Sequence, residues 1–158
     1  MRNAYPCVNE TLLGVSSVVL IFLLCSSAFA ALGEDVSTIQ SDGARMKAAV
    51  RVVPGMSYSV HEMRASSGIA VREFVSPAGR VFGVAWQGPY LPDLRQLLGE
   101  HFDDYVQAAE NPARVRSRMM HLETGDMVFE SGGHMRFFVG RAYLRSELPD
   151  GISADDVR

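Results

Sequence analysis

Two three-residue loops, each ending in glycine, constrain the fold of this chain more than any other feature. Ser66-Ser67-Gly68 and Pro77-Ala78-Gly79 separate three runs, near 56–65, 69–76 and 80–87, that are rich in β-branched and aromatic residues. Loops of this length join antiparallel strands when a type I turn is closed by a left-handed glycine, and Pro77 fixes the φ that such a turn requires. The sequence therefore predicts a three-stranded antiparallel meander.

Charged residues beside the first loop decide the register of its hairpin. A loop of three residues places Glu62 opposite Arg72 and His61 opposite Glu73. A shift of one residue would place Glu62 against Glu73, and two like charges disfavour that arrangement. We therefore predict the register in which Glu62 and Arg72 form a structural pair.

The same register assigns the side chains of the meander to two faces. Continued through the second loop, it pairs Phe74 with Phe82 and puts Trp86 on the face of Arg72, with Ala85 on the opposite face. Both faces are largely apolar, so we expect both to be covered by other parts of the chain.

Two segments have the apolar periodicity of a helix. Residues 34–47 carry apolar side chains at helical spacing behind acidic residues, although Gly43 weakens the pattern. From Pro92, apolar residues repeat at i, i+3, i+4 and i+7 as far as Val106, and Asn111-Pro112 ends the pattern. We expect one helix before the meander and a longer one after it.

After Pro112 the periodicity returns to that of strands. Three more strands are predicted at 115–121, 127–131 and 134–144, with turns at 123–125 and at Gly132-Gly133, where both glycines tolerate positive φ. Arg114, Arg116 and Arg118 alternate along the first of these and predict a solvated edge strand. The prediction is an α+β fold, a single domain of about six antiparallel strands in two three-strand meanders with two main helices, ordered helix, three strands, helix, three strands.

The first thirty residues have the three zones of a cleavable signal peptide. A short polar start carries Arg2, residues 11–24 form an apolar run, and Ala28-Phe29-Ala30 has the form of a cleavage site. The apolar run is shorter than the roughly 20 residues of a membrane-spanning helix. We expect residues 1–30 to be removed, and residues 31–158 to be exported to the periplasm or beyond as one α+β domain without a stable membrane anchor.

Removal of that segment would leave a domain without cysteine. Cys7 and Cys25 both lie within it, so a disulfide, a thiolate nucleophile and a cysteine-based zinc site are excluded from residues 31–158. The net charge of −3 argues against nucleic acid as a partner. The sequence has no phosphate-binding loop, and we expect no cofactor.

Four strings of the sequence resemble those of a known family. They are SPAGRVF at 76–82, AWQGP at 85–89, LPDLRQLLG at 91–99 and SGGHMR at 131–136. In combination they are similar to a family of small exported bacterial proteins of unknown function, and the resemblance spans most of residues 31–158. It implies an exported bacterial protein and transfers no catalytic residue.

The histidines do not predict a metal site. His61, His101, His121 and His134 are the only four, and no two of them are spaced i, i+2 or i, i+4. A zinc site would need three or four ligands drawn from distant segments. We therefore assign no metal ligand.

A predicted Gly132-Gly133 turn makes Ser131, His134 and Arg136 a candidate site. The turn would place Ser131 across from His134, with Arg136 on the same face. A serine beside a histidine is half of a hydrolase site, but the chain has no nucleophile elbow and no carboxylate placed to orient the histidine. The alternative is a hairpin tip whose polar side chains bond locally.

Three more residues are candidates for binding. His61 beside Glu73 suits acid–base chemistry, and structural pairing within a covered sheet explains the pair equally well. Tyr90 follows a strand and would stack on a ligand if it is exposed, or pack at the edge of the core if it is not.

Two functions follow from these observations. The first is a non-catalytic binding or accessory module of the bacterial envelope whose partner is an envelope protein or a small anionic ligand; its support is the lack of a catalytic motif. The second is a small hydrolase-like enzyme that uses His134 with Ser131, or His61 with Glu73. An unfilled pocket lined by those residues would favour the enzyme, and an exposed apolar patch would favour the binding module.

Overall fold

Seven antiparallel strands form one sheet in the computed structural model, which describes residues 32–110 and 119–158. Their order across the sheet is β1-β2-β3-β4-β7-β6-β5. The strands are β1 (Ala48–Pro54), β2 (Ser59–Ala65), β3 (Ala70–Val75), β4 (Val81–Gly88), β5 (Met119–Thr124), β6 (Met127–His134) and β7 (Phe137–Leu144). The α+β class and the antiparallel sheet are confirmed, with one strand more than predicted.

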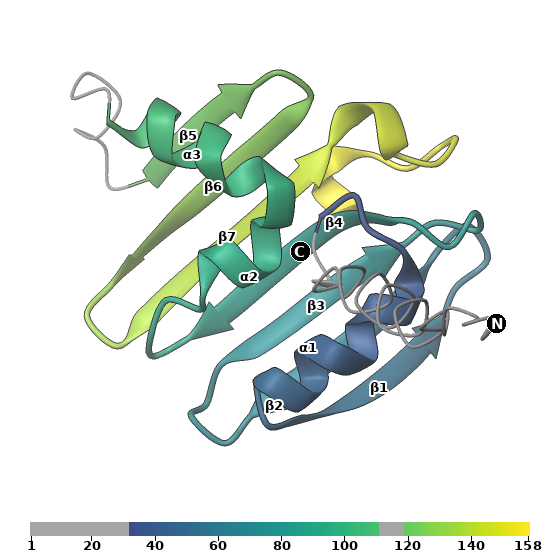
Figure 1. The fold of residues 1–158 in the computed structure, drawn as a ribbon, viewed down its shortest axis with the longest axis horizontal. Coiled ribbons are helices and arrows are strands. Elements are labelled where there is room, and N and C mark those ends of the chain that lie inside the picture. Colours follow the sequence, from purple (N-terminus) through teal and green to yellow (C-terminus); the bar gives the residue numbers. More distant parts are fainter. Residues whose placement is uncertain (1–31, 111–118) are drawn as a thin grey trace, which may run out of the picture.

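All the α-helices of the described residues lie on one face of this sheet (Figure 1). α1 (Ile39–Arg45) lies across β1 to β3, and α2 (Leu94–Leu98) and α3 (Phe102–Ala109) lie on the side of β5 to β7. The long helix predicted after Pro92 is broken into α2 and α3. The break lies at Gly99, which takes a φ of 52° and begins a short 3₁₀ turn, Gly99–His101.

The two glycine-ended loops form as predicted. Gly68 and Gly79 have φ of 87° and 80°. The amide of Ala65 donates to the carbonyl of Ile69, at 2.9 Å, so the first loop has three residues. The register is confirmed with it, since Glu62 pairs with Arg72 and His61 with Glu73.

The assignment of faces on β4 was right for Val81 and Phe82 but wrong from Gly83 onward, because a β-bulge interrupts the pairing of β3 with β4. Val75 pairs with Val81 but Phe74 pairs with Gly83, so Phe82 is an additional residue in β4. One extra residue exchanges the faces of all residues that follow in the strand. Trp86 therefore points away from the face of Arg72, and Ala85 lies on it.

Strand β1 was not predicted, and the junction before it explains why. Lys47 takes a φ of 51°, a left-handed conformation that glycine usually supplies, and it turns α1 directly into β1. Gly43 is required by the same junction: a Cβ there would lie 2.4 Å from Cγ2 of Val50 in β1. The glycine that seemed to weaken the helix lets it pack closely on the sheet.

The predicted turn at Gly132-Gly133 was also wrong. Both glycines lie within β6, and the hairpin turns at Met135 and Arg136, with His134 paired to Phe137. A Cβ on Gly133 would lie 2.3 Å from the carbonyl oxygen of Phe137, so glycine serves the close approach of β7. The predicted signal peptide and the alternating arginines 114, 116 and 118 lie outside the described residues.

Two apolar clusters cover the two faces of the sheet. The larger lies under the helices and includes Met63, Val71, Trp86, Leu97 and Phe129. The smaller lies on the opposite face, where residues 145–158, the C-terminal strap, cross the sheet. It contains the side chains of Phe74, Phe82, Ala85, Val128, Tyr143 and Val157.

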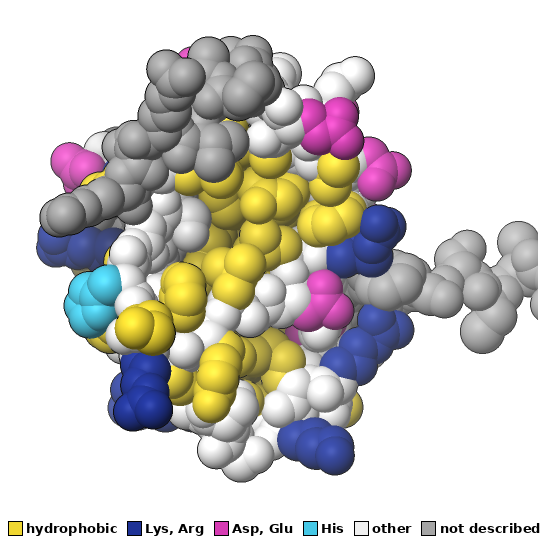
Figure 2. Space-filling view, turned by 90° about the vertical axis from the view of Figure 1, so that its left-hand side faces the viewer, with side chains coloured by type: hydrophobic (Ala, Val, Ile, Leu, Met, Phe, Trp, Pro, Cys, Tyr) yellow, Lys and Arg dark blue, Asp and Glu magenta, His cyan; other side chains and the backbone are white. Residues whose placement is uncertain are grey.

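The strap covers only part of its face. Tyr143 and Phe74 lie beneath it, whereas Val139 on the same face of β7 is 40% exposed and Met119 on β5 is 61% exposed. Figure 2 shows hydrophobic side chains gathered in the middle of the side of the molecule seen from the left of Figure 1, with charged side chains toward its margins. The exposure of Val139 and Met119 means that the strap leaves part of the apolar sheet face uncovered.

Candidate functional site

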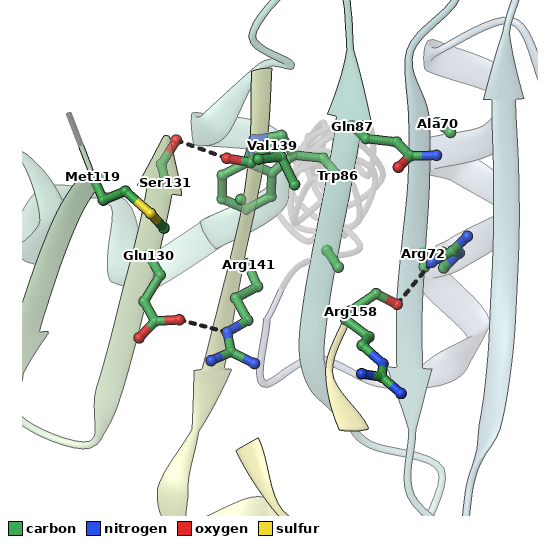
Figure 3. Close-up of a pocket in the computed structure, with 12 residues that line it drawn as sticks. Ala70, Arg72, Trp86, Gln87, Met119, Glu130, Ser131, Val139, Arg141 and Arg158 are labelled. Atoms are coloured by element: carbon green, nitrogen blue, oxygen red, sulfur yellow. Dashed lines mark hydrogen bonds and ion pairs between the residues drawn. The ribbon is translucent and has the colours of Figure 1, made fainter. Parts of the chain in front are cut away.

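A groove of about 550 Å³ lies on the strap face of the sheet. Its lining comes from β3, β4, β5, β6, β7 and the end of the strap (Figure 3). Because strand side chains alternate between faces, Ala70 and Arg72, Ala85 and Gln87, and Val139 and Arg141 direct their side chains toward the groove. Trp86, Ser131 and Gly140 lie between such positions and also line it. A volume of this size is typical of sites for small organic molecules.

One end of the groove is charged. Antiparallel pairing places Arg72, Ala85, Arg141 and Glu130 in one row across four strands. Nε of Arg141 donates to Oε2 of Glu130 at 2.6 Å, and Nη1 of Arg72 donates to the main-chain oxygen of Arg158 at 2.8 Å (Figure 3). Three arginines and one glutamate therefore surround the small Ala85.

The other end of the groove is mainly apolar. The next row contains Ala70, Gln87, Val139 and Met119, with Gly132 between the last two. Gln87 is the polar side chain of this row, and its amide both donates and accepts hydrogen bonds. This half of the groove therefore offers apolar contact and one amide.

The bottom of the groove is formed where β4 and β7 pair. Trp86 and Gly140 line it, and a Cβ on Gly140 would lie 2.3 Å from Cζ2 of Trp86. Glycine at this position lets the indole ring pass under β7, where it packs on Phe129 with ring centroids 5.5 Å apart. Trp86 thus belongs to the core and to the base of the groove.

Arg141 holds the strap that closes the charged end. Its Nη1 donates to the carbonyl oxygens of Ala154 at 2.5 Å and Val157 at 3.4 Å. Val157 is fully buried, and its two methyl groups would lie 3.0 Å and 3.1 Å from a Cβ on Gly83. Arg158 therefore reaches the groove because the preceding residue is anchored.

His61 and Glu73 are neighbours, as predicted, but they lie under α1 and do not line the groove. Glu73 is fully buried, and burial together with the nearby Asp42 carboxylate raises its pKa to about 8. Asp42, also fully buried, accepts a hydrogen bond from Nε2 of Gln96 at 2.8 Å. Burial lowers the pKa of His61. The pair is part of a buried polar cluster and is closed to substrate.

Ser131, His134 and Arg136 are not brought together. Ser131 and His134 lie three residues apart on one strand, so alternation directs them to opposite faces. Ser131 donates to the carbonyl oxygen of Val139 at 3.5 Å and lines the groove. The exposed His134 stacks on Phe137, and Arg136 occupies the turn with a φ of 67°. The prediction that the three share a face was wrong, because it rested on the misplaced turn.

Of the remaining predicted residues, Tyr90 lies apart from the groove and Glu62 lies beside its Arg72. Tyr90 is 63% exposed in the loop before α2 and does not line the groove. Glu62 pairs with Arg72 at 3.5 Å between Oε1 and Nε, with both side chains partly exposed. Among residues 32–110 and 119–158, no group of three His, Cys, Asp or Glu side chains is arranged to hold a metal ion.

Sequence reasoning missed most of the groove. Glu130, Val139 and Arg141 alternate along β6 and β7, and that period of two was visible, but the misplaced turn hid which residues are opposite each other. Arg72 was named for its pair with Glu62 alone. No sequence pattern indicated that Arg158 would return to the sheet.

Comparison with known proteins identifies a family. The family model described as "Protein of unknown function (DUF2844)" matches residues 28–157. No curated protein and no solved structure matches the chain. Within the two described segments, no helix is both long and apolar enough to cross a membrane.

Proposed function

The chain belongs to the DUF2844 family of proteins of unknown function, and we propose that it is an exported, non-catalytic module that binds a small, largely apolar molecule in the groove of its strap face. The observation that carries the proposal is the groove itself, about 550 Å³ beside exposed Val139 and Met119. Apolar side chains left in water on a sheet face favour a ligand that covers them.

The make-up of the groove supports binding over catalysis. Among the residues that the structure describes, the lining includes one hydroxyl, that of Ser131, and no histidine. A nucleophilic serine needs a base within hydrogen-bond reach, and the Ser131 hydroxyl instead donates to the carbonyl of Val139. His61 with Glu73, the other pair suited to acid–base chemistry, is buried under α1.

Export is the second part of the proposal, and its support is the sequence of residues 1–30. Arg2, the apolar run of residues 11–24 and the Ala28-Phe29-Ala30 site have the order of a secretory signal. Mass spectrometry of the protein recovered from the periplasm should give a chain that starts at Ala31. A product that keeps residues 11–24 and sediments with membranes would contradict this part.

Binding can be tested with the tryptophan fluorescence of the exported protein. Trp86 is the only tryptophan of the chain and lies at the base of the groove. We expect the uncharged apolar dye Nile red to bind at a single site and to quench Trp86. Ala70→Leu should weaken binding, because the larger side chain fills the groove.

Ala49→Leu is the matched control. Ala49 lies on the same face of the sheet, in the same row as Ala70, and it is exposed and does not line the groove. Equal loss of binding in both variants, or no binding by the unchanged protein, would contradict a ligand site in the groove.

A further inference from the structure

We propose that the ligand of the groove is a small uncharged amide, whose polar group bonds to the side-chain amide of Gln87 and whose apolar body lies on Val139 and Met119. This inference rests on the proposed binding function and adds the chemical class of the ligand. Two observations carry it. The arginines of the groove already face carboxylates, and the Gln87 amide has no hydrogen bond among the described residues.

The charges at the charged end of the groove are balanced. Nε of Arg141 donates to Oε2 of Glu130 at 2.6 Å, and Oδ1 of Asp155 lies 3.9 Å from Nη1 of the same arginine. Nε of Arg72 lies 3.5 Å from Oε1 of Glu62. Two of the arginines that line the groove are therefore paired with acidic side chains.

Arg158, another arginine of the lining, also has an acidic neighbour. The pKa of Asp156 is lowered by hydrogen bonds from Ser153 and by the positive charge of Arg158. The main-chain oxygen of Arg158 accepts a hydrogen bond from Nη1 of Arg72 at 2.8 Å. Each arginine in the described lining thus has a carboxylate beside it, and an anionic ligand would have to compete with that carboxylate.

A charged ligand gains little in such a groove. An anion would leave water for guanidinium groups that are already paired. An ammonium group would face those guanidinium groups, while Glu130, the carboxylate of the described lining, is held by Arg141. A charge that leaves water without a partner costs far more than a neutral polar group does. The charge pattern therefore selects an uncharged molecule.

The side chain of Gln87 supplies the polar contact in the apolar row. It is exposed, and no hydrogen bond holds its amide within the part of the chain that the structure describes. In Figure 3 this amide extends from β4 toward Ala70 of β3. A side-chain amide both donates and accepts hydrogen bonds. A ligand that carries a carbonyl and an N–H group matches it on both counts.

The row that contains Gln87 leads to apolar surface. Val139 pairs with Gln87, and Gly132 pairs with Val139 and with Met119. Because Gly132 has no side chain, the space between Val139 and Met119 is open to a ligand, and both of these side chains are exposed. A polar group on Gln87 therefore allows the apolar body to extend over Val139 toward Met119.

The size of the groove limits the ligand to a small molecule. About 550 Å³ lies within the range of sites for single small ligands. An amide with a medium-length alkyl chain or one aromatic ring combines this volume with an apolar body and one uncharged polar group. Both have the shared chemistry that the groove selects.

The test compares three probes with the same eight-carbon chain. Octanamide, octanoate and octylamine, which is protonated at pH 7, are each titrated into the exported protein by calorimetry. Octanamide should bind about ten-fold more tightly than either charged probe, because a charged head group loses its water without gaining an unpaired partner. The affinity for octanamide should not change with salt concentration, since its binding forms no ion pair.

Two variants locate the amide. Gln87→Met keeps the length of the side chain and removes its amide, so it should weaken octanamide binding about five-fold and leave Nile red binding unchanged. Gln107→Met is the matched control, because Gln107 is an exposed glutamine of α3 that does not line the groove. A thermal melt of each variant verifies that it folds, and the comparison of the three probes needs no variant.

The outcomes separate this inference from the function on which it rests. Octanoate or octylamine binding as tightly as octanamide, or Nile red binding without octanamide binding, overturns the uncharged amide and leaves the apolar site standing. An octanamide affinity that Gln87→Met does not reduce, or that Gln107→Met reduces equally, overturns the contact with Gln87. Binding of neither Nile red nor any of the three probes overturns the proposed function as well.

Discussion

We predict that the buried carboxyl of Glu73 makes the stability of this protein fall with rising pH, and that Glu73→Gln removes most of that fall. Glu73 is fully buried under α1, and burial followed by the negative charge of Asp42 raises its pKa from 4.5 to about 8. A raised carboxyl pKa means that the folded state holds a proton that the unfolded state releases. The stabilisation is therefore complete below about pH 4.5 and is lost as the pH rises to about 8.

The magnitude follows from the two pKa values. Each pH unit between them costs about 1.36 kcal/mol, so the full difference between 4.5 and about 8 corresponds to about 5 kcal/mol. Burial lowers the pKa of His61, so that group destabilises the fold only below its ordinary value of 6.5. Above pH 6.5 His61 no longer affects the stability. Ionisation of Glu73 alone should then lower the free energy of unfolding by about 2 kcal/mol by pH 8.

Urea unfolding at several pH values from 6.5 to 9 measures this change directly. Glu73→Gln keeps the shape of the neutral side chain and cannot ionise, so its free energy of unfolding should fall less than that of the unchanged protein over the same range. The fall that remains comes from His121, whose pKa is raised by its hydrogen bonds to Glu123 and Glu130. Glu62→Gln is the control, because Glu62 is a partly exposed glutamate on the other face of the same hairpin. Its curve should follow that of the unchanged protein.

Either of two results would refute the reasoning. A flat profile of the unchanged protein between pH 6.5 and 9 would mean that Glu73 keeps an ordinary pKa despite its burial. A Glu73→Gln protein that is less stable than the unchanged protein at pH 9 would mean that the ionised carboxylate is stabilised by its surroundings.

Three further substitutions test the groove and its surroundings. Gly140→Ala should destabilise by about 1–3 kcal/mol in urea unfolding, because the new methyl group would lie 2.3 Å from Cζ2 of Trp86. Arg141→Ala should increase the hydrogen exchange of the strap amides, since it removes the bonds to the strap carbonyls; unchanged exchange would mean that buried Val157 alone anchors the strap. His134→Ala should change stability by less than about 0.5 kcal/mol in a thermal melt, because the ring is exposed and its interactions within the described residues are a stack on Phe137 and a contact with the carbonyl of Met135.

The first hairpin could be predicted from the sequence because two independent signals agreed. Gly68 allows the left-handed conformation that a three-residue loop requires, and the pairing of Glu62 with Arg72 excludes the shifted register. Local chemistry determined both the turn and the register. No knowledge of the rest of the fold was needed.

Other turns could not be predicted, because the residues at positive φ are not glycines. Lys47 and Arg136 take φ of 51° and 67°, and each begins a strand whose start the sequence did not reveal. Conversely, Gly133 lies inside β6, where the approach of Phe137 leaves no room for a Cβ. A glycine marks either a turn or a close contact, and only the contacts of the fold tell which.

The bulge between β3 and β4 explains why the groove exists at all. In a regular register, Phe74 would pair with Phe82, and Trp86 would stand on the strap face beside Arg72, where its ring would occupy the groove. The extra residue in β4 turns Trp86 into the core under Gly140 and gives its place to Ala85 and Gln87. The strap face therefore carries the methyl group of Ala85 in place of the indole ring of Trp86. This methyl group lies between Arg72 and Arg141, where the strap ends.

Bulges change the direction of side chains without a sequence signature as clear as that of a turn. The alternation of side chains along β4 could therefore be read from the sequence, but the face on which Ala85 and Gln87 lie depends on one unpaired residue.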